Sequence, residues 1–189
     1  MVMTKVGTLL NGKTKVFAKP ISIEFVPHQN IKMQLQKHKI LNKSEIAPNV
    51  FLIEFKRTFG FKSGQIIGLT NNQELAPRLY SICSAPNEDN IRILFNVKPD
   101  GELTPPLSTV ESGDDIWITH VQGKFIFDDE PAWWIATGTG IAPFYSMFKN
   151  GQKPLKLIQG GRTTNDFYFE NEFTKLDDYV RCCSQENAE

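Results

Sequence analysis

The sequence predicts two units of different fold class: an antiparallel β-barrel or sandwich, followed by a parallel α/β unit. Two observations carry this prediction. Between Lys37 and about Gln122, six short runs have the composition of β-strands, and Gly, Pro, Asn and Asp separate most of them. After Pro131 the pattern changes to strand, helix, strand, helix, strand, which is the rhythm of a parallel sheet with crossover helices. We therefore place a domain boundary near residue 130.

The strands of the first unit are short and rich in Ile, Val, Phe and Leu. The six runs cover residues 37–41, 49–57, 65–70, 78–84, 90–98 and 115–121. Ahead of them, residues 7–18 have the pattern of a β-hairpin that turns at Asn11-Gly12, a dipeptide typical of two-residue hairpin turns. Residues 1–35 are thus an N-terminal extension with a β-hairpin, to which we assign no chemistry, and residues 36–130 form the first domain.

The second domain, residues 131–189, begins with the apolar strand A-W-W-I-A-T at 132–137. The expected order is then a helix at 143–151, a strand at 155–162, a helix at 170–176 and a strand at 178–184. We expect the adjacent pair Trp133 and Trp134 to pack in the core.

The composition is that of a globular protein, with 40% hydrophobic and 22% charged residues among 189. No run of eighteen apolar residues occurs, and the N-terminus lacks a signal-peptide core, so we expect a cytoplasmic protein without membrane insertion. The three cysteines and three histidines lack metal-site spacing, so no metal is expected, and Cys83 is read as a packing residue. Any redox chemistry must therefore come from an organic cofactor.

Net charge is zero, but it is unevenly distributed along the chain. Residues 1–60 carry a balance of +7 and residues 61–189 a balance of −7. A basic surface attracts acidic partners at long range, so the front half is a candidate docking surface; the alternative is an ordinary solvated surface rich in lysine. No basic helix or ladder of aromatic and basic residues accompanies the charge, so nucleic acid is not an expected partner.

An arginine, a tyrosine and a serine lie close together in the fourth β-type run, within A-P-R-L-Y-S-I-C-S-A-P at 76–86. In an extended chain Arg78 and Tyr80 share one face, about 6 to 7 Å apart, whereas Leu79 and Ser81 share the other. A guanidinium suits a phosphate and an aromatic face suits a planar ring. This strand could therefore hold the two ends of one ligand.

Two further segments are candidate anion sites. G-T-G-I-A-P at 138–143 follows an apolar strand and opens a helix, so its main-chain N–H groups and the helix dipole favour a phosphate. Pro143 replaces the third glycine of the usual dinucleotide fingerprint, and a tight structural turn is the alternative. In P-D-G-E-L-T-P-P-L at 99–107, we expect Thr104 to cap a short helix begun by Pro105, either as an anion site or as a plain surface helix.

In this order, the motifs resemble the ferredoxin-NADP(+) reductase family, and most closely its bacterial members that serve ferredoxin or flavodoxin. The motifs are R-L-Y-S, P-D-G-E-L-T-P-P-L, G-D-D-I-W-I-T, A-T-G-T-G-I-A-P-F and G-G-R-T-T-N-D-F-Y-F-E-N-E-F. The resemblance runs from about residue 37 to the end. It implies a six-stranded Greek-key antiparallel β-barrel that holds FAD, followed by a parallel α/β domain that binds NADP(H).

The family continues well beyond the last residue of this chain. We therefore expect the nucleotide-binding domain to be partial and the sequence to be truncated at the C-terminus. A remnant of three strands would expose apolar surface and an unpaired sheet edge.

The resemblance also implies roles for individual residues. Arg78 would pair with the FAD pyrophosphate, Tyr80 would stack on the isoalloxazine, and Ser81 would hydrogen-bond near flavin N5, which places Tyr80 and Ser81 at the reacting ring. The other FAD contacts implied are Leu79, Asn96, Val97, Gly101, Leu103 and Thr104. The NADP(H) contacts implied are Thr139, Gly140, Ile141, Ala142, Pro143, Arg162, Ser184 and Gln185. Arg162 would lie by the adenosine end, with a plain surface arginine as the alternative.

The reaction implied is hydride transfer from nicotinamide C4 to flavin N5, followed by single-electron steps to ferredoxin or flavodoxin. The cofactors carry this chemistry, so no side chain has to act as acid or base in the hydride step. Two alternatives stay open. One is an NADH-dependent reductase component of an oxygenase or cytochrome system, and the other is an FAD-binding electron-relay subunit that never meets NAD(P)H.

The coenzyme preference depends on the last residues. Many NADP-selective relatives have a Ser-Arg pair where this chain has Ser184-Gln185. Glutamine offers no charge to the 2′-phosphate, so we expect NADP(H) as coenzyme with weak selectivity over NADH, unless Arg162 and Lys175 compensate.

Overall fold

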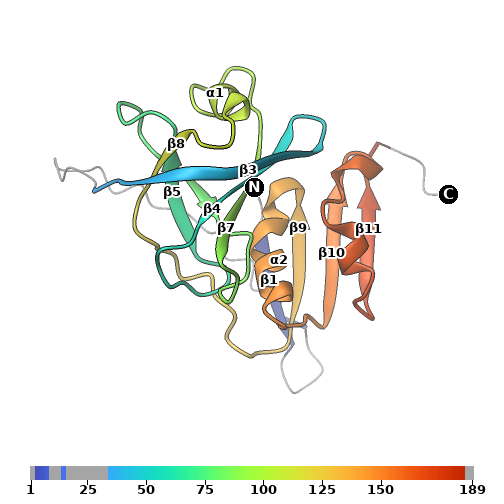
Figure 1. Cartoon of the computed structure of the whole chain (residues 1–189). Coiled ribbons are helices and arrows are strands. Elements are labelled where there is room, and N and C mark those ends of the chain that lie inside the picture. Colours follow the sequence, from blue (N-terminus) through green and yellow to red (C-terminus); the bar gives the residue numbers. More distant parts are fainter. Residues whose placement is uncertain (1–2, 9–13, 16–33, 186–189) are drawn as a thin grey trace.

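The computed structural model describes residues 3–8, 14–15 and 34–185, and it confirms an antiparallel β-barrel beside a parallel α/β unit (Figure 1). The six predicted β-type runs are all strands of one sheet, in the order β6-β5-β8-β3-β4-β7. Their bounds are Gln36–Ala47 (β3), Val50–Lys56 (β4), Ile66–Thr70 (β5), Arg78–Ser81 (β6), Asn90–Asn96 (β7) and Asp115–Ile118 (β8). The division of the chain at residues 35 and 130 stays a prediction.

The barrel rather than the sandwich forms because the two ends of this sheet meet. Ile82, directly after β6, makes an antiparallel bridge to Ile93 of β7, so the sheet curls back on itself. On the inner face, Phe55 lies opposite Ile91, and Ile53 lies opposite Ile93. All four of these side chains are completely buried. The alternation of buried and outward residues along β4 and β7 thus supplies the core of the barrel.

The α/β unit has the predicted order of elements. Its strands β9 (Ala132–Thr137), β10 (Lys156–Gly161) and β11 (Tyr179–Cys183) are parallel, in the order β11-β10-β9. After β9 come a 3₁₀ turn, η1 (Gly138–Ile141), and helix α2 (Ala142–Lys149); after β10 come η2 (Thr164–Asp166) and α3 (Glu170–Phe173). Helix α3 is a single turn and is shorter than predicted, because the N–H groups of Lys175 and Leu176 donate to carbonyls three residues back, those of Glu172 and Phe173, and so leave the α-helical pattern.

The N-terminal extension joins the α/β sheet instead of the barrel. Strand β1 (Met3–Thr8) pairs antiparallel with β2 (Thr14–Lys15), as the predicted hairpin requires, while the turn at Asn11-Gly12 lies outside the described residues. On its other edge β1 pairs antiparallel with β9, from Met3 opposite Ala136 to Gly7 opposite Ala132. The main-chain groups of that edge of β9 therefore bond to β1, and among the described strands β11 and β2 form the two edges of the sheet, so the expected unpaired edge lies at β11.

A second core cluster crosses from the α/β unit to the barrel. Trp134 is 1% exposed, stacks on Phe144 at 5.3 Å between ring centroids, and shares the cluster with Cys83 and Leu94 of the barrel. The predicted packing role of Cys83 is thereby confirmed. Trp133 is 36% exposed, with the ammonium of Lys156 5.6 Å from its ring centroid, so its predicted core position is wrong. Adjacent residues of a strand point to opposite faces, and only one face of β9 meets the cluster.

Candidate functional site

A cavity of about 830 Å³ opens where the three parallel strands end. The carboxyl ends of parallel strands lie at one edge of a sheet, and ligands of open α/β sheets bind in the crevice there. The barrel contributes the residues that end β7 and follow it. The lining residues are Asn96, Lys98, Thr137, Gly138, Thr139, Gly160, Gly161, Arg162, Asp166, Tyr168, Cys182, Cys183 and Ser184.

The end of β9 and the turn after it contribute Thr137, Gly138 and Thr139 to the lining of this cavity. Gly138 has a φ of 52°, and a Cβ built there would have no neighbour within 4 Å, so the space over this residue is open. The first N–H groups of a helix have no partner within the helix, and the dipole favours an anion beside them. The side chains of Ile141 and Ala142 are buried in the core, so these residues anchor the turn from behind.

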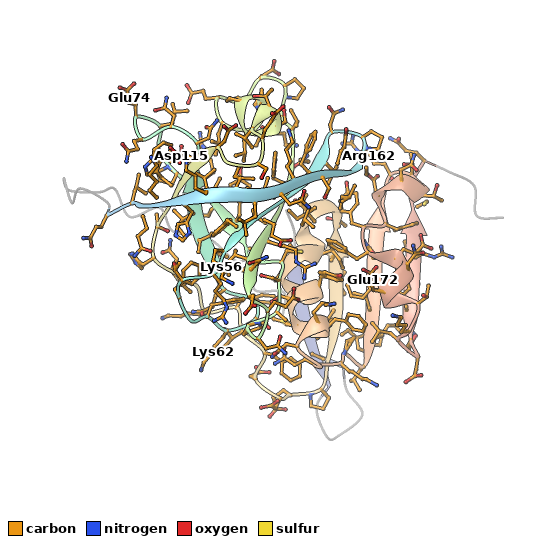
Figure 2. The ribbon with its side chains drawn as sticks, in the orientation of Figure 1. Lys56, Lys62, Glu74, Asp115, Arg162 and Glu172 are labelled. Carbon is orange, nitrogen blue, oxygen red and sulfur yellow. The ribbon has the colours of Figure 1, made fainter. Side chains whose placement is uncertain are left out.

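The turn after β10 presents Arg162 at the rim of the cavity (Figure 2). The Asp166 carboxylate holds this turn, since one oxygen accepts from the N–H groups of Arg162 at 2.8 Å and Thr163 at 3.2 Å. A Cβ on Gly161 would lie 2.7 Å from the Cβ of Asp166, so the close approach requires glycine. The guanidinium of Arg162 makes no ion pair within the described residues, and its charge is available to a ligand.

Lys98 brings a second cation to the same cavity from the barrel side, and the sequence reading missed it. It begins a tight turn in which the N–H of Gly101 donates to the Lys98 carbonyl at 2.8 Å. The N–H of Lys98 in turn donates to the Thr104 hydroxyl at 2.8 Å. Lys98 directly follows Asn96 and Val97, which were both predicted ligand contacts, and this position in the sequence could have indicated that Lys98 also reaches the ligand.

The predicted cap of the short helix is wrong in its details. Helix α1 (Thr104–Thr109) has Leu103 at the N-cap position, without a side-chain hydrogen bond to the helix. Thr104 lies inside the first turn, and its hydroxyl accepts from the Lys98 N–H instead. Thr104 therefore closes the loop that carries Gly101, and this hydrogen bond holds the loop against the end of β7.

Two cysteines adjacent in the sequence, Cys182 and Cys183, also line the cavity and were not predicted there. Strands β10 and β11 are in register, with Gly160 opposite Cys182 and Gly161 opposite Cys183. Residues opposite each other in a ladder share a face, so Cys182 shares a face with Gly160, and Cys183 shares the other face with Gly161. The sequence shows both dipeptides, but only the register aligns them.

On the barrel, β6 carries the arginine and tyrosine of the R-L-Y-S run. Tyr80 packs edge-on against Phe95, with 6.4 Å between ring centroids, and burial raises the pKa of its phenol to about 12 against the opposing charge of Arg78. Arg78 is exposed and makes no ion pair within the described residues, whereas Ser81 is buried. Phe95 adjoins Asn96, so the Tyr80 ring contacts the strand that ends at the cavity.

The structure brings together only part of the predicted site. Four of the predicted ligand contacts line the cavity: Asn96, Thr139, Arg162 and Ser184. The others lie on β6, on the loop and first turn of α1, on η1 and α2, or beyond β11: Arg78, Leu79, Tyr80, Ser81, Val97, Gly101, Leu103, Thr104, Gly140, Ile141, Ala142, Pro143 and Gln185. Gln185 still contacts the site indirectly, since its N–H donates to the Arg162 carbonyl at 2.9 Å. The roles of all these residues stay predictions.

Known proteins resemble both units. Residues 134–183 match the family model described as the oxidoreductase NAD-binding domain. The flavodoxin/ferredoxin–NADP reductase of Escherichia coli (strain K12) is 30% identical over 121 residues, which cover 58% of this chain and 49% of the relative. The ferredoxin–NADP reductase of Pseudomonas aeruginosa is 30% identical over 145 residues, which cover 68% of this chain and 56% of the relative. The chain thus spans about half the length of the curated relatives it matches.

Solved structures agree on the fold. A Neisseria gonorrhoeae ferredoxin NADP+ reductase, determined with bound FAD and NADP, superposes with a TM-score of 0.72 at 21% identity, covering 82% of this chain and 70% of that one. A phthalate dioxygenase reductase superposes with a TM-score of 0.69 at 20% identity, covering 81% and 53%.

The antiparallel barrel beside a parallel sheet, together with the match of residues 134–183 to the oxidoreductase NAD-binding domain, defines the class of fold. Within that class, the order of motifs and the curated relatives agree: the chain belongs to the ferredoxin–NADP(+) reductase family. Within the described ranges, no helix has the length and hydropathy that crossing a bilayer requires, and no cluster of metal-ligating side chains occurs.

Proposed function

We propose that this chain binds FAD on the barrel and NADP(H) in the cavity, and that it transfers electrons between NADP(H) and a one-electron protein carrier such as ferredoxin or flavodoxin. One observation carries the proposal: Asn96 and Lys98 of the barrel share a single cavity with the carboxyl ends of β9, β10 and β11. A ligand in that cavity contacts both units. This suits a coenzyme that must meet a second cofactor held by the barrel.

The cavity fits a dinucleotide phosphate by its charge and its open main chain. Lys98 and Arg162 are both cations, and Asp166, the one carboxylate among the described lining residues, already accepts hydrogen bonds from two main-chain N–H groups. The turn at Gly138 leaves open space in which a phosphate can approach N–H groups. These features support the proposed contacts of Thr139, Arg162 and Ser184 with NADP(H).

The barrel fits FAD through β6 and the loop before α1. Arg78 is exposed and free of ion pairs within the described part of the chain, so it is available to a pyrophosphate. Tyr80 is half-buried and held by Phe95, so its ring has a defined orientation against a planar ligand. The proposed contacts of Gly101 and Leu103 with the same ligand are supported by the tight turn that Thr104 closes, which holds this loop at the end of β7.

Bound FAD supplies the exchange between two-electron and one-electron chemistry. The protein residues bind and orient, and none of them has to take a proton in the hydride step. Cys83 in particular does not act as a nucleophile, because it is completely buried and burial raises the pKa of its thiol.

The proposed electron acceptor is an acidic carrier that docks on the basic barrel. Part of the basic charge is already neutralised, because Lys37 and Lys39 both pair with Asp115 at 2.6 Å. The Lys43 ammonium likewise donates to the Ser108 carbonyl at 2.6 Å.

A second candidate function is an NADH-dependent reductase component of an oxygenase system. The toluate 1,2-dioxygenase electron transfer component of Pseudomonas putida is 26% identical over 148 residues, which cover 74% of this chain and 43% of that relative. Gln185, which offers no charge to a 2′-phosphate, also favours this alternative. Coenzyme preference separates the two functions.

The test is anaerobic stopped-flow mixing of the FAD-loaded protein with NADPH and, separately, with NADH. Bleaching of the flavin band with NADPH is the expected result, because it requires hydride transfer. Tyr80→Ala should weaken FAD binding more than Cys83→Ala, whose side chain only packs in the core. A protein that binds FMN instead of FAD, or that keeps its flavin oxidised with both coenzymes, would contradict the proposal.

A further inference from the structure

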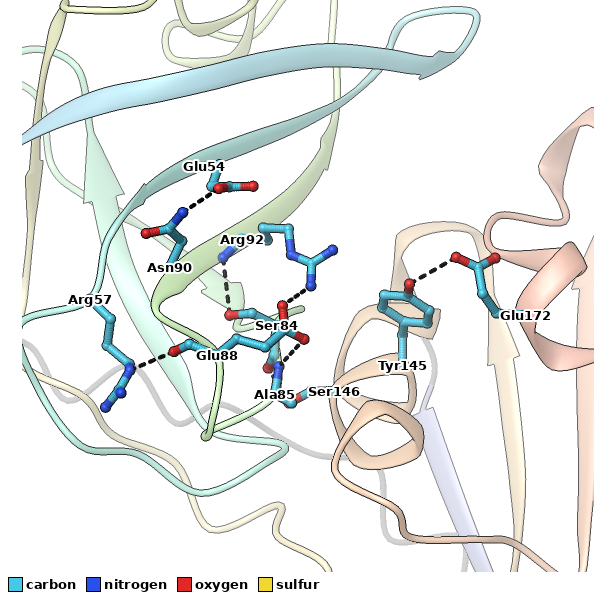
Figure 3. Close-up of polar contacts among 10 residues, drawn as sticks. All are labelled: Glu54, Arg57, Ser84, Ala85, Glu88, Asn90, Arg92, Tyr145, Ser146 and Glu172. Carbon is cyan, nitrogen blue, oxygen red and sulfur yellow. Dashed lines mark hydrogen bonds and ion pairs between the residues drawn. The ribbon is translucent and has the colours of Figure 1, made fainter.

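Three buried serines connect helix α2 to the barrel, and two of them, Ser84 and Ser146, are labelled in Figure 3. The hydroxyl of Ser146 in α2 donates to the carbonyl of Ser84, three residues after β6, at 2.6 Å. The hydroxyl of Ser63, in the loop before β5, donates to the carbonyl of Ser146 at 3.2 Å. Ser84 and Ser146 are both 0% exposed. One residue of α2 thus contacts two separate segments of the barrel through buried hydrogen bonds.

The barrel side of this contact is itself held rigidly. The Ser84 hydroxyl accepts from the N–H of Arg92 in β7 at 3.1 Å. Arg92 forms an ion pair with Glu88, and the Glu88 carboxylate also accepts from the Ala85 N–H at 3.1 Å. The carbonyl that receives the Ser146 hydroxyl therefore belongs to a segment whose neighbours are bonded to β7.

The helix side is held from the opposite direction. Tyr145, next to Ser146, donates its hydroxyl to Glu172 of α3 at 2.9 Å. Met147, on the other side of Ser146, packs against Gly64, where a Cβ would lie 2.8 Å from the Met147 methyl. Helix α2 is thus hydrogen-bonded to its own unit through Tyr145 and to the barrel through the next residue, Ser146.

Hydrogen bonds and apolar packing hold this boundary in different ways. The apolar cluster around Trp134 stabilises the contact, but the hydrophobic effect has no direction and tolerates small rotations. A buried hydrogen bond is directional, and a buried carbonyl that loses its donor is left unsatisfied, so the Ser84 carbonyl favours the one orientation of α2 in which Ser146 reaches it. The serines therefore set the angle between the two units more than they set the total stability.

The two segments that Ser146 joins are continuous with the two proposed cofactor sites. Ser84 comes three residues after Ser81, at the end of the strand proposed to face the flavin, and Ser146 comes three residues after Pro143, in the helix that follows the proposed nucleotide turn. We propose that Ser146 is a positioning residue, whose buried hydroxyl fixes the nucleotide turn at 138–143 against β6 and thereby aligns the two cofactors. This inference rests on the proposed function.

Ser146→Ala removes one atom from the core, so the fold should survive. A misplacement of about 1 Å can lower a rate about a hundredfold when two reacting atoms must meet. We expect flavin reduction by NADPH to slow by about 10- to 100-fold, while affinities for FAD and for the coenzyme change by less than about threefold. Ser63→Ala, which keeps the Ser146 hydroxyl bond, should show a smaller loss in the same direction. The matched control is Ser112→Ala, since Ser112 also donates to a distant carbonyl, that of Leu41 at 2.9 Å, but within the barrel.

A second measurement does not depend on activity. Residual dipolar couplings of the backbone amides report the relative orientation of the barrel and the α/β unit. One alignment should fit both units in the wild type and in Ser112→Ala, whereas the two units should need different alignments in Ser146→Ala.

The outcomes separate this inference from the proposed function. Reduction of the wild type together with an unchanged rate in Ser146→Ala overturns the positioning role and leaves the proposed function standing. If the FAD-loaded wild type is not reduced, the proposed function fails and the couplings decide: a single shared alignment in Ser146→Ala overturns the role of the serine. Two alignments support it as the residue that orients the units.

Discussion

The charge of the cavity leads to a quantitative prediction for Arg162. Arg162 lines the cavity, is exposed and has no ion pair within the described residues, and the neighbouring Asp166 carboxylate already accepts hydrogen bonds from two main-chain N–H groups. A hydrogen bond to a charged group contributes about 1.5 to 3 kcal/mol, and the exposed position of Arg162 argues for the lower end. Arg162→Gln should therefore weaken binding of a 2′-phosphate about tenfold. Lys98→Gln removes a more flexible point charge and should cost about threefold.

The assay is titration calorimetry with two small probes, adenosine 2′,5′-bisphosphate and AMP. Arg162→Gln should lower affinity for the bisphosphate about tenfold but affinity for AMP by less than about threefold. Lys153→Gln is the control, because Lys153 is an exposed lysine outside the cavity lining. Gln185→Arg, next to the Arg162 carbonyl, should strengthen bisphosphate binding alone.

Two results would refute this reasoning. Equal losses for both probes in Arg162→Gln would show that the arginine does not contact the 2′-phosphate. A wild-type preference for NADPH over NADH beyond about a thousandfold, unchanged by Gln185→Arg, would place selectivity on other residues.

Three further predictions concern stability and docking. Gly64→Ala should be strongly destabilising in thermal unfolding, since its Cβ would lie 1.9 Å from the Phe125 carbonyl oxygen, whereas Gly113→Ala, at the same φ of 95° but in open space, should cost far less; similar losses would remove the clash as the cause. Burial raises the pKa of Tyr80 and Tyr168 to about 12, so the folded state keeps these protons longer than the unfolded state, and stability should be complete below about pH 10 and fall towards pH 12. Phenolate absorbance that rises near pH 10 while ellipticity stays native would contradict this. Reduction of an acidic one-electron carrier should slow as ionic strength rises, and a rate that ignores salt would exclude docking by the lysines.

The local sequence pattern determined most of the strands and helices of this protein. Alternating apolar residues predicted all six barrel strands, and the apolar run at 132–137 coincides with β9 residue for residue. Pro143 and Gly151 bracket the predicted helix, which the structure has as α2. These signals depend on one residue and its near neighbours, because side-chain period, fixed φ and turn geometry are local properties of the chain.

Tertiary structure decided what depends on contacts between distant segments. Two adjacent tryptophans have the same local signal, yet only the packing face of β9 buries Trp134 and exposes Trp133. Thr104 stands before a proline in a sequence typical of a helix cap. In the structure its hydroxyl instead accepts a hydrogen bond from the N–H of Lys98, six residues earlier. The pairing of β1 with β9 and the hydrogen bond from Ser146 to Ser84 join segments separated by more than sixty residues. The sequence contains both members of each pair, but only folding of the whole chain brings them within reach, because the free energy that selects such partners is shared over the entire core.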